Sequence, residues 1–135
     1  MPASAGEVVS TLDLAATFYA YAGLPKPEEM QGRSLRLLLE GKADSRDVAY
    51  SEWYVHPSRC GVPLQLRTVR TKTHKCTFDL DSGAGELYDL MNDPEEMVNR
   101  FDDPAYAKTR QVLEDMMRIR PGKILERLPE PVGMA

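Results

Sequence analysis

The sequence has few of the features that mark disulfide-rich, membrane-spanning or nucleic-acid-binding proteins. Its 135 residues include only two cysteines, which are too few for a disulfide framework. Its apolar runs, such as residues 37–39, fall far short of the roughly 20 residues that cross a bilayer. Lys and Arg number 17 against 21 Asp and Glu, and this net charge of −4 gives no general attraction for phosphate backbones or anionic lipid. We therefore expect no nucleic acid and no membrane as a partner.

The N-terminal residues carry no targeting signal. Residues 1–7 have neither the basic stretch nor the apolar stretch of a signal peptide. A chain that begins naturally at Met1 is expected in the cytoplasm, whereas a missing upstream part allows a periplasmic or secreted location. The hydrophobic fraction of 42% and the charged fraction of 28% are typical of a folded, soluble domain.

Helical patterns occupy both ends of the chain. Ser10 and Asp13 form a capping-box-like pair before a helix predicted over residues 12–22. A shorter helix is predicted over residues 35–40, and a C-terminal helix runs from a cap at Asp103 to Ile119. The apolar stripe of the first helix is expected to comprise Leu12, Ala15, Ala16, Tyr19 and Ala22, with Phe18 beside it.

The middle third changes to the pattern of short β-strands. Strands are predicted over residues 48–54, 64–70, 75–80 and 86–90. Because the links between them are short, neighbouring strands must be antiparallel. The predicted fold class is α+β: a small antiparallel sheet of three or four strands, with N-terminal helices and a packed C-terminal helix. We assign one domain to residues 1–125, including a helical lead-in over 8–41, and a proline-rich tail to residues 126–135.

Two patterns suggest chemistry, but a simpler interpretation is favoured for each. Cys60 follows His56 by four residues, yet nothing places a carboxylate behind the histidine, so a loop between strands is favoured over a nucleophile. Residues 79–86 begin like a calcium loop, but the closing glutamate comes too early, so they predict a turn. The two cysteines and two histidines lack the paired spacing of a zinc site. The sequence therefore predicts no metal site.

A cationic run over residues 67–75 is a candidate anion-binding site. Its candidate ligands are Arg67, Arg70, Lys72 and Lys75. The functional interpretation is a site for sulfate, phosphate or nucleic acid. The simpler interpretation, which we favour, is a solvated strand face or a sheet edge that lysine protects against aggregation.

Four stretches form an ordered series of motifs. They are residues 9–17 with 22–25 (V-S-x-x-D-L-x-x-T…A-G-x-P), 30–35 (M-Q-G-R-S-L), 51–52 with 70–75 (S-E…R-T-x-x-x-K) and 86–99 (E-L-Y-D-L-x-x-D-P-x-E-x-x-N). In their order and spacing these motifs resemble the C-terminal part of type I sulfatases, the formylglycine-dependent branch of the alkaline phosphatase superfamily. One departure is Ala16, where the family has proline.

The resemblance implies a sulfatase C-terminal subdomain with a structural role and a place at the substrate rim. His56 and Arg59 are the candidates for that rim. It implies no catalytic residue here, because calcium and formylglycine, which forms in a C/S-x-P-S-R motif, belong to the catalytic domain of an intact parent enzyme. We therefore expect this catalytically incomplete chain to be inactive alone as a sulfuric ester hydrolase. Its expected partner is a sulfatase catalytic domain or a second copy.

Two alternatives to this function remain open on the sequence. The first is a stand-alone module that binds sulfated or other anionic glycans through its cationic run. The second is a remnant without function. Salt-sensitive binding of a sulfated glycan distinguishes the first alternative from the second.

Overall fold

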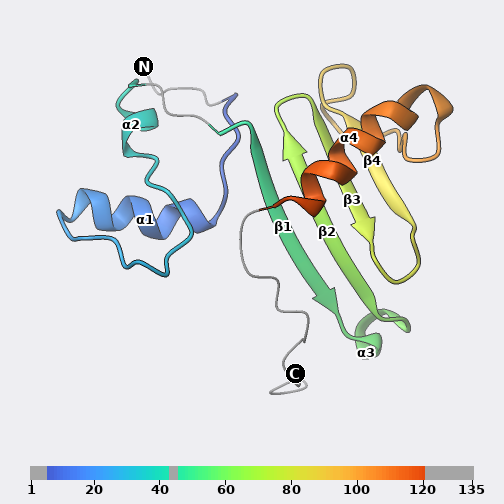
Figure 1. Ribbon diagram of the computed structural model, residues 1–135, viewed down its shortest axis with the longest axis horizontal. Helices are drawn as coiled ribbons and strands as arrows, with labels where there is room; N and C mark the ends of the chain where they lie inside the picture. Colours follow the sequence, from blue (N-terminus) through green and yellow to red (C-terminus); the bar gives the residue numbers. More distant parts are fainter. Residues whose placement is uncertain (1–5, 43–45, 121–135) are drawn as a thin grey trace.

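The computed structural model describes residues 6–42 and 46–120. Within these residues, four antiparallel strands that pair in chain order form a single sheet (Figure 1). The predicted tail over 126–135 lies outside the described residues. In chain order the elements are α1 (Leu12–Tyr21), α2 (Arg36–Leu39), β1 (Val48–Val55), α3 (Pro57–Cys60), β2 (Leu64–Thr71), β3 (His74–Asp79), β4 (Gly85–Asp89), the 3₁₀ turn η1 (Pro104–Tyr106) and α4 (Ala107–Arg118). The predicted α+β class, with a small antiparallel sheet, is confirmed.

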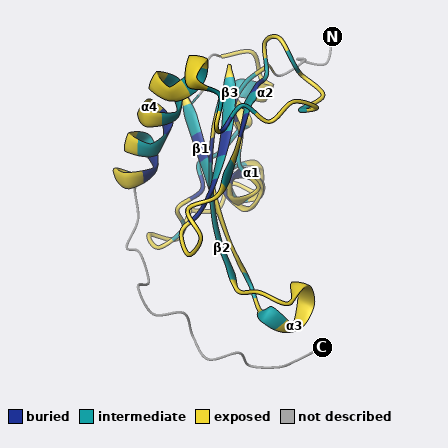
Figure 2. Cartoon of the chain, turned by 90° about the vertical axis from the view of Figure 1, so that its right-hand side faces the viewer, coloured by how far each residue is buried: buried dark blue, intermediate teal, exposed yellow. Residues whose placement is uncertain are grey.

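Helix α4 lies across one face of the sheet (Figure 2). Helices α1 and α2 lie to the side of the sheet, beyond strand β1 (Figure 1). Strands β1 and β2 pair along their whole length, from Val48 opposite Thr71 to Val55 opposite Leu64. Strand β3 pairs with β2 only as far as Leu66, so β1 and β2 continue past the sheet as a two-stranded arm that ends in α3 (Figure 2).

The hydrophobic core fills the space between the sheet and α4. Alternate residues of the central strands point to this face, because successive side chains of a strand point to opposite sides. Val69, Cys76 and Leu87 are fully buried there, and α4 contributes Leu113 and Met117. Helix α4 is therefore an ordinary amphipathic helix. The predicted cap residue, Asp103, accepts a 3.0 Å hydrogen bond from the Ala105 N–H, but it caps η1, the 3₁₀ turn that leads into α4.

Two buried aspartates end β3 and β4 and organise the turns that follow. Asp79 accepts hydrogen bonds from the Gln65 N–H at 3.0 Å and the Ser82 hydroxyl at 2.5 Å. Its side chain is therefore occupied by the turn, which confirms the turn interpretation of residues 79–86. Asp89 accepts from Asn92 Nδ2 at 2.8 Å and from the Tyr106 hydroxyl at 2.9 Å, which ties β4 to η1.

Acid is expected to remove the stabilising contribution of Asp89. Hydrogen bonds from Asn92, and then from Tyr106, lower the pKa of Asp89 from 3.8 to about 2. Because the folded-state pKa is below the unfolded one, the contribution is fully present above about pH 4 and is lost as the pH falls through about 2. The urea midpoints of the native chain and Asp89→Asn should differ clearly at pH 7 and converge near pH 2. Asp81→Asn changes an exposed turn residue, so the difference between its urea midpoint and that of the native chain should not depend on pH in this way.

Candidate functional site

A fully buried carboxylate joins the helical lead-in to the start of the sheet. Asp13, on α1, accepts a 2.8 Å hydrogen bond from the Ser10 N–H, and this bond confirms the predicted capping pair. It also accepts from the Arg33 N–H at 3.0 Å and forms an ion pair with the Arg46 guanidinium. Sequence reasoning missed the last two partners. They connect three segments that lie 20 and 33 positions apart.

A second polar residue of α1 continues this connection. The Thr17 hydroxyl donates to the Asp13 carbonyl at 2.7 Å and accepts from the Leu35 N–H at 2.8 Å. Just before Arg33, the chain passes so close to α1 that a Cβ atom on Gly32 would lie 2.0 Å from the Leu12 carbonyl oxygen. The Q-G-R-S-L motif therefore requires glycine at this position because a larger residue has no room.

The outer face of the lead-in is apolar and exposed. Of the five positions of the predicted stripe of α1, only Ala16 is buried in this chain. Asp13, Ala16 and Thr17 instead turn toward the rest of the chain. The large exposed apolar side chains are Leu12, Leu14, Phe18 and Tyr21 on α1, Leu24 after it, and Leu37 and Leu39 on α2. A face of this kind is typical of a surface that another chain or domain covers.

The four candidate anion ligands do not converge on one site. Arg70 and Lys75 lie on the sheet face opposite α4, and both pair with Glu96, at 3.3 Å and 2.5 Å. Glu96 adopts a left-handed backbone, with φ of 56°. Its carboxylate therefore neutralises much of the charge that these two cations bring to the open face.

The other two candidate ligands point elsewhere. Arg67 lies on the α4 side of the sheet, with its Nε 3.8 Å from a carboxylate oxygen of Glu52. Lys72 lies in the turn between β2 and β3 and pairs with Glu7 at 2.8 Å. Because β2 and β3 are the inner strands of the sheet, the interpretation of this run as a protected sheet edge is wrong.

The two rim candidates lie together at the tip of the arm. His56 caps α3, with its Nδ1 accepting from the Ser58 N–H at 3.3 Å, and Arg59 lies exposed in the same short helix. Cys60 donates its thiol to the Val62 carbonyl at 3.0 Å, and so it is engaged with the backbone rather than with His56. The structure brings His56 and Arg59 to one loop, away from the cations of the open face. Their contact with a substrate stays a prediction.

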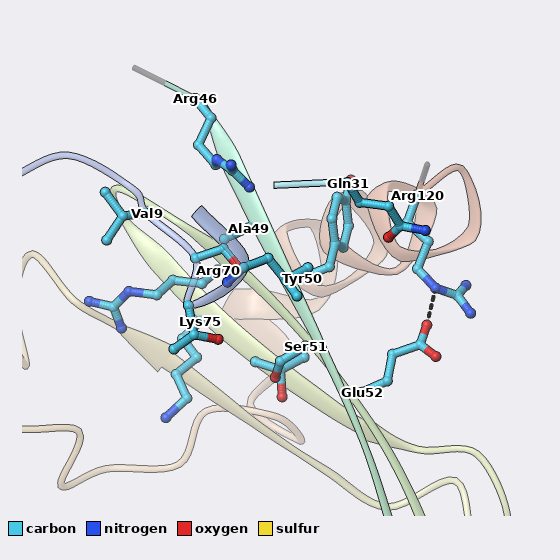
Figure 3. A pocket seen from close by; sticks show the side chains of 14 residues that line it. Val9, Gln31, Arg46, Ala49, Tyr50, Ser51, Glu52, Arg70, Lys75 and Arg120 are labelled. Carbon is cyan, nitrogen blue, oxygen red and sulfur yellow. Dashed lines mark hydrogen bonds and ion pairs between the residues drawn. The ribbon is translucent and has the colours of Figure 1, made fainter. Parts of the chain in front are cut away.

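A cleft of about 890 Å³ lies beside β1, between the sheet and the start of the lead-in. It is lined by Val9–Leu12, Gln31, Arg46, Ala49–Glu52, Thr68, Arg70, Lys75 and Arg120 (Figure 3). The Arg120 guanidinium points toward Glu52 and forms an ion pair with its carboxylate, as Figure 3 shows. The cleft carries four cationic side chains and one carboxylate, but no nucleophile with an adjacent base.

The described residues do not fit a metal or a formylglycine centre. Within residues 6–42 and 46–120, no group of three or more His, Cys, Asp or Glu side chains could hold a metal ion. Neither cysteine lies in a C/S-x-P-S-R motif. We therefore derive no catalytic step through calcium or formylglycine. Over the same residues, no helix has the length and apolar character needed to cross a membrane.

Comparison with known proteins finds similar regions within longer proteins. Residues 2–121 match the family model described as N-sulphoglucosamine sulphohydrolase, C-terminal. Two proteins of Bacteroides thetaiotaomicron are similar over 111 residues: an N-acetylglucosamine-6-O-sulfatase at 35% identity and a Delta 4,5-hexuronate-2-O-sulfatase at 37%. Each match covers 78% of this chain, but only 20% and 23% of the two relatives. The chain thus spans about a fifth of the length of these relatives.

A solved structure shares the fold. It was determined in complex with its substrate, D-glucosamine-2-N,6-O-disulfate, and superposes with a TM-score of 0.67 at 32% sequence identity. The similarity covers 84% of this chain and 25% of that one.

Proposed function

Because this chain belongs to the family of N-sulphoglucosamine sulphohydrolase C-terminal regions, we propose that it completes a sulfatase that acts on sulfated sugars. It is the C-terminal subdomain of such an enzyme, and the catalytic domain supplies calcium, formylglycine and the sulfate-binding groups. The subdomain then has a structural role, with the His56–Arg59 loop at the substrate rim. Its compartment follows that of the catalytic domain, periplasmic or secreted where that domain is exported.

The exposed apolar face of α1 and α2 carries this proposal. Phe18 is 69% exposed and Leu12 57% exposed, while Asp13 on the same helix is fully buried. Hydrophobic burial normally places leucine and phenylalanine inside and the carboxylate outside. This inverse arrangement is stable when another domain or chain covers the apolar side of the helix. The relatives, which are several times longer, have the additional chain that such cover requires.

A chimeric enzyme tests the proposal. This chain replaces the matching C-terminal region of the Bacteroides N-acetylglucosamine-6-O-sulfatase, to which it is 35% identical. We expect the chimera to hydrolyse a 6-O-sulfated N-acetylglucosamine substrate well above the enzyme truncated before that region. The isolated chain should show no turnover above a denatured control.

A matched variant tests the role of the apolar face. Phe18→Glu in the chimera places a charge on that face and should reduce turnover at least tenfold, whereas Glu28→Gln, at an exposed polar position, should leave turnover unchanged. A chimera no more active than the truncated enzyme contradicts the proposal, as does sulfatase turnover by the chain alone. The glycan-binding alternative is not favoured, because its four cations diverge and each has a carboxylate partner.

A further inference from the structure

The single tryptophan of the chain lies exposed at the base of the two-stranded arm that β1 and β2 form beyond β3. Trp53 on β1 lies opposite Leu66 on β2, and its side chain is 69% exposed. Burial of this large ring is favourable, and tryptophan is therefore enriched at binding interfaces. Within residues 6–42 and 46–120, no hydrogen bond, aromatic contact or cation–π contact uses the Trp53 side chain. The ring is therefore a surface available for binding.

The Trp53 ring points to the face of the sheet away from α4. On the same strand, Tyr50 packs against the core and donates its hydroxyl to the Met116 carbonyl of α4 at 3.1 Å. Successive side chains of a strand alternate between the two faces, so residue 53 points to the open face. Figure 2 shows that the arm bends away from α4, which brings α3 toward the same side. Trp53 and α3 therefore lie on one side of the arm.

The tip of the arm carries a cation that no carboxylate neutralises. Arg59 is exposed on α3 and makes no hydrogen bond or ion pair within the part of the chain that the structure describes. Residues 53–66 contain neither Asp nor Glu. The neighbouring carboxylate, Glu52, lies on the α4 side of the sheet, where it pairs with Arg67 and Arg120. Although the chain has a net charge of −4, the arm is therefore free of acidic groups and attracts an anion.

The spacing of the ring and the cation fits a chain of sugars rather than a single sugar. Each residue of a strand advances the chain by about 3.3 Å, so His56, which caps α3, lies about 10 Å from Trp53. Arg59 follows within the single turn of α3. A ligand that contacts the Trp53 ring and the Arg59 guanidinium together therefore extends over more than one sugar ring.

A sulfated glycan has the chemical groups that this side of the arm requires. The face of a sugar ring presents C–H groups with a small positive charge, and the face of an indole ring carries a small negative charge. A guanidinium donates paired hydrogen bonds to the oxygens of a tetrahedral or planar anion. The arm is also separate from the apolar face that we assign to the catalytic domain, because α3 lies at the end of the sheet away from α1 and α2 (Figure 1).

We propose that the arm binds the part of a sulfated glycan next to the reacting sugar. The Trp53 ring stacks on a sugar face, and the Arg59 guanidinium binds a sulfate or carboxylate group of the same glycan. This inference rests on the proposed function and makes it more specific: the substrate is an oligosaccharide of two or more units. The reacting sulfate lies at the catalytic domain, and the arm supplies binding energy from a remote part of the substrate.

The fluorescence of Trp53 tests this binding directly, because no second tryptophan contributes to the emission. The full chain, with the exposed Cys60 thiol kept reduced, is titrated with a tetrasaccharide that contains D-glucosamine-2-N,6-O-disulfate and with its unsulfated counterpart. We expect the sulfated tetrasaccharide to shift the emission to shorter wavelengths and to protect Trp53 from acrylamide quenching, both in a saturable way. The unsulfated one should bind about tenfold more weakly or less.

Two variants of the arm assign the binding to its open side. Arg59→Gln removes the charge and should raise the Kd of the sulfated tetrasaccharide about tenfold or more. Tyr54→Ala is the matched control, because it removes a partly exposed aromatic ring from the other face of the same strand and should leave the Kd unchanged. An emission that does not respond at about 10 mM tetrasaccharide, or equal Kd values for the native chain and Arg59→Gln, overturns the inference.

The chimera tests whether this binding serves catalysis. Trp53→Ala should lower the ratio of kcat/KM for the tetrasaccharide to kcat/KM for the single sugar about tenfold, mainly through KM, whereas Tyr54→Ala should not change this ratio. If Trp53→Ala instead lowers the thermal midpoint of the chimera as much as Phe18→Glu does and leaves the ratio unchanged, the catalytic domain covers the ring and the inference is wrong. An inactive chimera contradicts the proposed function, and the titration of the isolated chain still decides whether the arm binds the glycan.

Discussion

Replacing Asp13 by alanine is expected to lower the free energy of unfolding by about 3 kcal/mol or more. The carboxylate is fully buried and is the acceptor for the Ser10 and Arg33 amides and the ion-pair partner of Arg46. Its removal leaves a largely buried guanidinium without that partner, and a buried charge that loses its partner is strongly destabilising. The lead-in should then separate from the start of the sheet.

Urea unfolding, followed by far-UV circular dichroism, measures this loss. Asp47→Ala is the matched control, because Asp47 is exposed just before β1, and it should change the free energy by less than about 0.5 kcal/mol. Asp13→Asn keeps an acceptor for the two amides and loses only the charge, so its effect should be smaller than that of alanine. If Asp13→Ala costs no more than the Asp47 control, Asp13 does not hold the lead-in in place.

The Asp13 cluster shows how far the sequence predicts a buried polar site. The local part, the capping pair of Ser10 and Asp13, could be predicted because both residues lie in one turn. The distant part, the bonds to the Arg33 amide and the Arg46 guanidinium, depends on how the chain folds back on α1. No periodicity within a single element contains that information. The Gln31–Leu35 motif nevertheless marked the segment that makes the contact.

The apolar stripe of α1 shows a second limit of the sequence. A hydrophobic pattern predicts which face of a helix will be covered, but it does not say which chain covers it. Here α1 turns small and polar residues toward its own chain and leaves Leu14 and Phe18 exposed. The sheet was predicted well, with strand ends within one residue, because short strands joined by short turns leave few topologies. Helix α3 was missed because one turn is too short for a periodic signal.

The order of the strands limited the interpretation of the cationic run. The sequence predicted neighbouring antiparallel strands but not that β1 is an edge and that β2 is internal. A sheet edge was therefore one of the two simpler interpretations of the run, alongside a solvated strand face, whereas the edge is β1, one strand earlier. The resemblance to type I sulfatases is confirmed by the family match over residues 2–121, since ordered motifs identify a family even where side-chain contacts cannot be predicted.

Leucine-to-alanine substitutions at two positions are expected to separate the inner core from the outer apolar face. Leu87 is fully buried beneath α4, and Leu87→Ala should cost about 3 kcal/mol, because it removes buried methyl groups and leaves a cavity. Leu39 on α2 is 57% exposed, and Leu39→Ala removes the same atoms at a cost below about 0.5 kcal/mol. Urea unfolding of the two variants measures this difference.

In the sulfatase chimera the effect of one variant of this pair should increase, while the effect of the other should stay the same. Leu39→Ala, which is nearly neutral in the isolated chain, should lower the thermal midpoint of the chimera, because a catalytic domain buries that leucine and the truncated atoms then leave a cavity. Leu87→Ala should cost a similar free energy in both settings, since its surroundings lie within the subdomain. If Leu39→Ala changes the stability of neither protein, the catalytic domain does not cover the outer face of α2. The contact with that domain is then limited to α1.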